Sequence, residues 1–129
     1  MINTVTLIPL TVAGTPSGNY DGSSQDWYSD PIKAANYYKG HGFIQTVWFN
    51  LENFQGTIII QATLDRSPGT VTDEDFATSP AWFEVARYGG DSTIITDYHP
   101  IAVPGNFTWL RAEIQNFNFG TIIRVNVTY

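Results

Sequence analysis

β-Branched residues constrain the fold of this chain more than any other feature of its sequence. Of its 129 residues, 15 are Thr, 13 are Ile and 8 are Val, whereas the strong helix formers Leu, Glu, Lys and Met number 5, 4, 2 and 1. Side chains branched at Cβ lose freedom in a helix but pack well on a pleated sheet. We therefore predict an all-β domain with at most one helical turn, at 73–76 behind an N-cap at Thr72.

Turn-forming residues divide the chain at strand-length intervals. Clusters rich in Gly, Pro, Asn, Asp and Ser occupy 13–24, 39–42, 53–56, 66–69, 89–91, 104–106 and 116–120. Between them we predict strands near 3–12, 31–38, 43–52, 57–65, 82–88, 92–98, 107–115 and 121–128. About eight such strands suit an antiparallel β-sandwich, jelly-roll-like or of another Greek-key type. A chain of this length holds one core, so we expect a single domain, 1–129, with a long surface loop near 14–30.

The charge balance and the lack of cysteine exclude several classes of function. The formal net charge is −6, and a general nucleic-acid binder needs a basic face, so we expect no nucleic-acid partner. Without cysteine there is no disulfide scaffold, thiolate nucleophile or Cys-ligated zinc site. The first residues show no basic segment before a long apolar run, and the longest apolar run, 58–60, is far too short to span a membrane. We therefore expect synthesis in a cytoplasm and no membrane partner.

Two histidines and three glutamates could carry chemistry, but simpler explanations fit them. His41 and His99 lie in or beside predicted turns and share no metal-ligand spacing, so we expect surface residues rather than a general base or zinc ligands. Glu52, Glu84 and Glu113 lie on predicted strands, where two facing carboxylates would suit a glycosidase. Carboxylates on the solvated side of a sheet are the alternative that we favour.

An acidic cluster completes the list of candidate chemical groups. Asp65, Asp73, Glu74 and Asp75 could hold calcium, but their spacing does not match an EF-hand loop. Phosphate-binding glycine loops and the serine-hydrolase elbow are also absent from the sequence. We therefore expect a chain that is not an enzyme, with no catalytic residue, no metal site and no cofactor.

Aromatic residues near the predicted loops are the richest candidates for contacts. Such rings can stack on sugars or enter a protein interface, and they can also close the ends of a sandwich as core. The aromatic candidates for interface or ligand contacts are Tyr20, Trp27, Tyr28, Tyr37 and Tyr38.

Several segments of the second half carry a resemblance to a known group of proteins. They are Phe54 to Asp65, Ser67-Pro68, Trp82 to Val85, Gly105 to Ala112 and the final predicted strand. This pattern, over about 43–129, resembles small structural proteins of tailed-bacteriophage virions, particularly those of large marine and T4-like phages. The resemblance implies a short β-sandwich that serves as a tail, fibre, neck or capsid-decoration part of a virion. It implies no particular binding residue.

Two functions follow as expectations. The first is a non-enzymatic virion protein, made in the host cytoplasm, that assembles with copies of itself and with other virion proteins. The alternative is a carbohydrate-binding β-sandwich module that recognises a host-surface glycan, which requires exposed aromatic side chains. A hydrolase stands third.

The two ends of the chain predict how it associates. The runs Asn3 to Leu10 and Thr121 to Tyr129 are strand-like and free of lysine, which often blunts a free sheet edge. Pro9 places the first run at an edge or at a bend between sheets. We predict that at least one terminal segment packs against another chain, by strand addition or through Leu7, Ile8 and Leu10. The alternative is that the two runs pair with each other and close the domain.

Overall fold

The computed structural model describes residues 4–35, 37, 44–64 and 82–129, and every regular element in them is a strand. The strands are β1 (Thr4–Ile8), β2 (Thr11–Val12), β3 (Trp27–Tyr28), β4 (Ile32–Lys33), β5 (Ile44–Thr63), β6 (Phe83–Pro104) and β7 (Trp109–Thr128). All pairings are antiparallel and belong to one sheet. The prediction of an all-β antiparallel fold is confirmed, and the helical turn expected at 73–76 lies outside the described residues.

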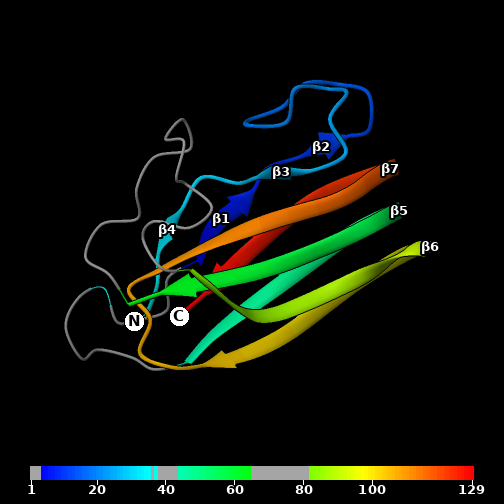
Figure 1. Cartoon of the computed structure of the whole chain (residues 1–129). Helices are drawn as coiled ribbons and strands as arrows, with labels where there is room; N and C mark the ends of the chain where they lie inside the picture. Colours follow the sequence, from blue (N-terminus) through cyan, green and yellow to red (C-terminus); the bar gives the residue numbers. More distant parts are fainter. Residues whose placement is uncertain (1–3, 36, 38–43, 65–81) are drawn as a thin grey trace.

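Three long strands fold this sheet over on itself. In Figure 1, β5, β6 and β7 each run to the end of the sheet where their labels stand, bend, and return. Their pairings divide accordingly into two layers. One layer has the order β1, second half of β7, first half of β5, second half of β6. The other has β3 and β4, first half of β7, second half of β5, first half of β6. Both layers are therefore halves of one antiparallel sheet.

The bends fall where turns were predicted. Register shifts interrupt the ladder of β5 on both sides of Phe54, and Asn53 and Asn116 have positive φ angles of 51° and 55°. β-Bulges and tight turns need the same left-handed residues. The strands predicted at 43–52 and 57–65 are therefore two halves of β5, and those at 107–115 and 121–128 are two halves of β7.

The core lies between the two layers. The rings of Phe49 and Tyr88, which belong to opposite layers, have centroids 5.4 Å apart, and those of Phe54 and Phe117 lie 5.6 Å apart next to the bend. Fully buried side chains from both layers fill the space, among them Val47, Ile58, Ile60, Leu110, Ala112, Ile114, Val125 and Val127.

Candidate functional site

The N-terminal part of the chain covers one edge of the sheet. β1, β2, β3 and β4 all pair with β7, and β1 places Thr4 opposite Thr128. Leu7 is 4% exposed and Ile8 is fully buried, so both belong to this chain's own core. This corrects the expectation that they pack against another chain, because the terminal runs pair with each other, as the alternative proposed. Leu10 is 59% exposed and stays a predicted contact.

Two of the aromatic candidates also belong to the core. Tyr20 and Trp27 are buried, with ring centroids 5.4 Å apart, and the Tyr20 ring lies 5.1 Å from that of Phe117. The expectation that they stack on a sugar or enter an interface is corrected, because the segment that carries them folds down onto the sheet. The sequence left this open, since a loop aromatic can serve as core or as contact.

The segment predicted as a loop, 14–30, ends with β3 and contains local hydrogen bonds. The Asp21 carboxylate accepts hydrogen bonds from the backbone N–H groups of Ser23 and Ser24, at 2.8 and 2.7 Å. These bonds, led by the one from Ser24, lower the pKa of Asp21 to about 2. Gly14 N–H donates to the Tyr20 hydroxyl at 3.0 Å. These bonds hold the turn of the loop, and the rings of Tyr20 and Trp27 point into the core.

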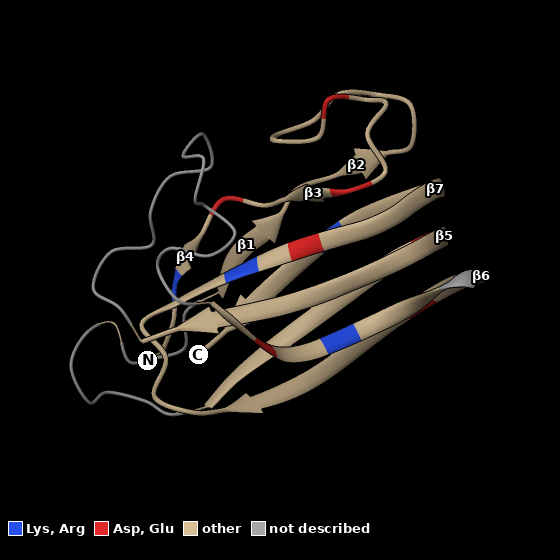
Figure 2. Cartoon of the chain, viewed as in Figure 1, with Lys and Arg blue, Asp and Glu red and all other residues tan. Residues whose placement is uncertain are grey.

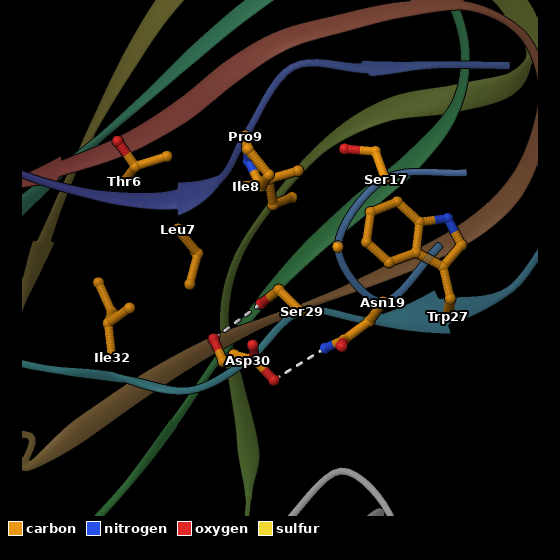
Figure 3. A pocket seen from close by; sticks show the side chains of 11 residues that line it. Thr6, Leu7, Ile8, Pro9, Ser17, Asn19, Trp27, Ser29, Asp30 and Ile32 are labelled. Carbon is orange, nitrogen blue, oxygen red and sulfur yellow. Dashed lines mark hydrogen bonds between the residues drawn. The ribbon is translucent and has the colours of Figure 1, made fainter. Parts of the chain in front are cut away.

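A cavity of about 250 Å³ lies between β1 and this loop. Figure 3 shows Leu7, Ile8 and Trp27 among its lining side chains, with Asn19 donating to the Asp30 carboxylate at 3.0 Å. The volume is just below the range usual for ligand pockets. Three of the predicted contact residues therefore meet here, but as the walls of a small cavity.

On the outer face of one layer, Tyr28 belongs to a stack around a buried arginine. The Arg111 guanidinium lies 4.4 Å from the ring centroids of both Tyr28 and Trp82 and donates from Nε to Gln61 at 2.6 Å. Burial lowers the pKa of Arg111 to about 10, and burial together with nearby Glu113 raises the pKa of Tyr28. Tyr28 thus shields a cation within the chain. No sequence spacing signalled Arg111, because the stack joins three distant segments.

The last two aromatic candidates differ in what the structure describes. Tyr37 is half-buried, its ring centroid 5.2 Å from that of Trp109 and 4.6 Å from the Lys33 ammonium. Tyr38 lies outside the described residues, as does His41. Tyr37 is therefore partly covered within this chain and remains a predicted contact.

The second histidine joins a cluster on β6. His99 stacks on Tyr88 with ring centroids 4.4 Å apart, and the Tyr88 hydroxyl donates to Asp97. Burial and the neighbouring Asp97 raise the pKa of Tyr88 to about 12, and that hydrogen bond lowers the pKa of Asp97. The cluster links the two layers at the edge of the sheet, since Tyr88 and His99 belong to opposite halves of β6.

Of the three glutamates considered for hydrolysis, Glu52 is exposed, whereas Glu84 and Glu113 contact side chains of this chain. Glu84 accepts two hydrogen bonds from Arg87, at 2.6 and 3.0 Å, and Glu113 accepts from Gln61 and Gln115. Among the described residues, no group of three or more His, Cys, Asp or Glu side chains could hold a metal ion. The acidic residues Asp65 and 73–75, considered for calcium, lie outside that part of the chain.

A shallow groove of about 670 Å³ crosses the outer surface next to the bend. Tyr98, 58% exposed, stands at its side in edge-to-face contact with Trp48, with ring centroids 5.6 Å apart. The polar residues lining the groove are Asn50, Glu52, Asn53, Thr96 and Asp97. An exposed ring beside amide, hydroxyl and carboxylate groups is an arrangement that can bind a sugar.

The edge opposite the N-terminal segments belongs to β6. β6 spans 22 residues and pairs with β5, and no described residue pairs with its other side. Phe83, Ile94 and Tyr98 are 40%, 57% and 58% exposed along it. Figure 2 shows few charged residues on the described strands. An edge of this length presents backbone N–H and C=O groups with which another strand can pair.

Comparison of the chain with family models, curated proteins and solved structures finds no match. In the described part of the chain, no helix has the length and apolar character needed to cross a membrane.

Proposed function

We propose that this chain is a non-enzymatic structural protein of a tailed-phage virion, and that it acts by assembling with other protein chains. The observation that carries the proposal is the edge of β6, which offers a long run of backbone donors and acceptors together with exposed Phe83 and Ile94. An edge of this kind is the usual template for strand addition by another chain. The resemblance of 43–129 to virion proteins is the reason for proposing a phage particle as the assembly. Jelly rolls, the fold type predicted from the sequence, are common in viral capsids.

The engagement of the candidate acids supports a non-enzymatic role. Glu84 and Glu113 accept hydrogen bonds from neighbouring side chains, and the pKa of Glu84 is lowered by Arg87. A general acid of a glycosidase needs a raised pKa. The described carboxylates therefore favour surface and structural roles.

The test is cross-linking mass spectrometry on phage particles. They are purified from a lysate of cells infected with the phage whose genome encodes this chain. A carboxylate-reactive linker suits the sequence, which has 12 acidic residues and few lysines. We expect the chain in fixed ratio to the particle proteins, with links from Glu84 to a second chain. Recovery of the chain only from the particle-free fraction would contradict the proposal.

A second candidate, carbohydrate binding, is favoured by the groove beside Tyr98. Its exposed ring and polar lining fit a sugar better than the buried Trp27 does. A glycan array tests it: binding that Tyr98→Phe keeps and Tyr98→Ala loses supports a stacking platform. Binding that is absent, or unchanged in Tyr98→Ala, speaks against this groove.

A further inference from the structure

The edge of β6 with which no described residue pairs has two unlike halves. In its second half, Pro100 lies opposite Trp48 and Pro104 lies opposite Ile44. Proline has no N–H to donate to an added strand, and edge strands commonly carry it for that reason. The first half, 83–88, contains neither proline nor lysine. Among the described residues, strand addition therefore meets no proline at 83–88 and is hindered by proline toward the end of β6.

A β-bulge shapes this open half. Gln61 pairs with Glu84 and Ile60 pairs with Ala86, so Val85 is the extra residue, and Val85 and Ala86 both pack against the core. The bulge turns Glu84 and Arg87, three positions apart, to the same face. There they form a two-bonded ion pair whose side chains are 43% and 55% exposed.

We propose that a second copy of this chain adds to β6 antiparallel, about a twofold axis between Val85 and Ala86. The inference deepens the proposed assembly function, on which it rests, by naming the partner and the register. The axis places Glu84 opposite Arg87 of the partner subunit, and Arg87 opposite the partner subunit's Glu84. It also places Phe83 opposite Tyr88 of the partner subunit on the other face. The bulge at Val85 puts Glu84 and Arg87 on the same face of β6, one on each side of the axis, so the twofold pairing sets acid opposite base.

Charge complementarity selects this occupant and this direction. The order Phe83-Glu84-Val85-Ala86-Arg87-Tyr88 matches itself when reversed, aromatic with aromatic and acid with base. Parallel addition would instead set Glu84 beside Glu84 and Arg87 beside Arg87, and like charges directly opposite are destabilising. Such a short ladder buries less surface area than a standard protein interface, so we expect a weak dimer. The high local concentration of the chain in a particle would favour its formation.

Sedimentation equilibrium on the full chain, over a wide range of concentration, tests the pairing. We expect the wild type to dimerise reversibly, and Arg87→Glu or Glu84→Arg each to raise the dimer Kd about tenfold or more. The double variant Glu84→Arg/Arg87→Glu restores the acid–base order and should return the Kd to within about threefold of wild type. Arg124→Glu, an exposed change of equal charge on β7, is the matched control and should leave the Kd unchanged.

Three results would overturn the proposal. They are a wild type that stays monomeric throughout, an Arg87→Glu Kd equal to that of Arg124→Glu, and a double variant that fails to recover. Far-UV circular dichroism and thermal melts of each variant establish that it is folded, which we expect because an exposed ion pair contributes little to stability. Particle cross-linking separates the two proposals. A monomer that still links to particle proteins overturns the dimer alone, and a dimer missing from particles overturns the virion function alone.

Discussion

The two edges of the sheet carry similar apolar and aromatic residues, which are buried at one edge and exposed at the other. Along β7, apolar and aromatic side chains of 4–33 close the edge, and Ile8, Tyr20 and Trp27 are buried there. Along β6, apolar and aromatic side chains such as Phe83, Ile94 and Tyr98 stay exposed, and no described strand covers them. Apolar content in a terminal or loop segment therefore does not by itself indicate a protein interface. A better indication is whether backbone groups of the neighbouring strand remain unpaired.

The covered edge depends on the bend of β7, which brings segments of 4–33 onto both layers. Gly120 has a φ of +92°, and a Cβ there would lie 2.0 Å from the carbonyl oxygen of Asn53. Gly14 has the same φ with nothing within 4 Å of its Cβ position. We expect Gly120→Ala to cost more than about 3 kcal/mol or to prevent folding, and Gly14→Ala to cost about 1 kcal/mol. Chemical denaturation compares them, and equal effects would refute a bend that requires this glycine.

Removing one aromatic ring from each edge should change the stability of the protein by very different amounts. Trp27→Ala opens a hole among Tyr20 and Phe117 and should lower the free energy of unfolding by about 3–5 kcal/mol. Tyr98→Ala, on the β6 side, should change it by about 0.5 kcal/mol or less, because the ring is mostly in solvent. Urea unfolding curves measure both. If the two losses are similar, Trp27 is not core.

A buried hydroxyl just after β3 adds a side-chain hydrogen bond to the backbone pairing with β7. Ser29 is 4% exposed, and its Oγ accepts a hydrogen bond from Ala112 N–H at 2.8 Å. Ser29→Ala leaves that buried N–H without this partner and should cost about 1–3 kcal/mol. Ser23→Ala, at an exposed loop hydroxyl, is the control and should stay within about 0.5 kcal/mol. A loss in the control as large as that of Ser29→Ala would show that the covered edge gains nothing from this bond.

The smallest expected effect is a dependence on pH at the β6 edge. The folded pKa of Tyr88 is about 12, above its ordinary value of 10.0, so its contribution to stability is complete below pH 10 and is lost as pH rises through about 12. The pKa of Asp97 is lowered, so its contribution is complete above its ordinary 3.8 and is lost as pH falls. Thermal melts against pH should show both losses, and Tyr88→Phe should remove the alkaline one. An unchanged alkaline slope in that variant would assign the loss to another group.

The sequence predicted the strands better than their connections. Alternation placed the halves of β5 and β7 correctly, because side-chain period is a local property. It did not show that 53–56 and 116–120 bend one strand rather than join two, since Asn and Gly with positive φ serve bulges and turns alike. The ladder that continues through the bend depends on neighbours far away in sequence, such as Gln55 with Phe119.

The candidate site was harder to predict than the fold. Tyr20 and Trp27 differ from Tyr98 in which strand lies beneath them, and that is set by pairing over long sequence separations, as between β1 and the end of β7. Pro100 and Pro104 were a usable signal that β6 lies at an edge. No sequence signal predicted the stack of Arg111 with Tyr28 and Trp82, because no local pattern distinguishes a buried arginine from an exposed one on the same strand.

Hydrogen–deuterium exchange at two protein concentrations tests the central claim most directly, namely that β7 is closed within the chain and β6 is the docking edge. We expect amides of 109–128 to exchange slowly at both concentrations. Within 83–88, we expect the amides that do not donate to β5 to exchange fast in dilute solution and to slow down as the concentration rises. Fast exchange along β7, or slow exchange of these amides of 83–88 that does not change on dilution, would contradict the claim.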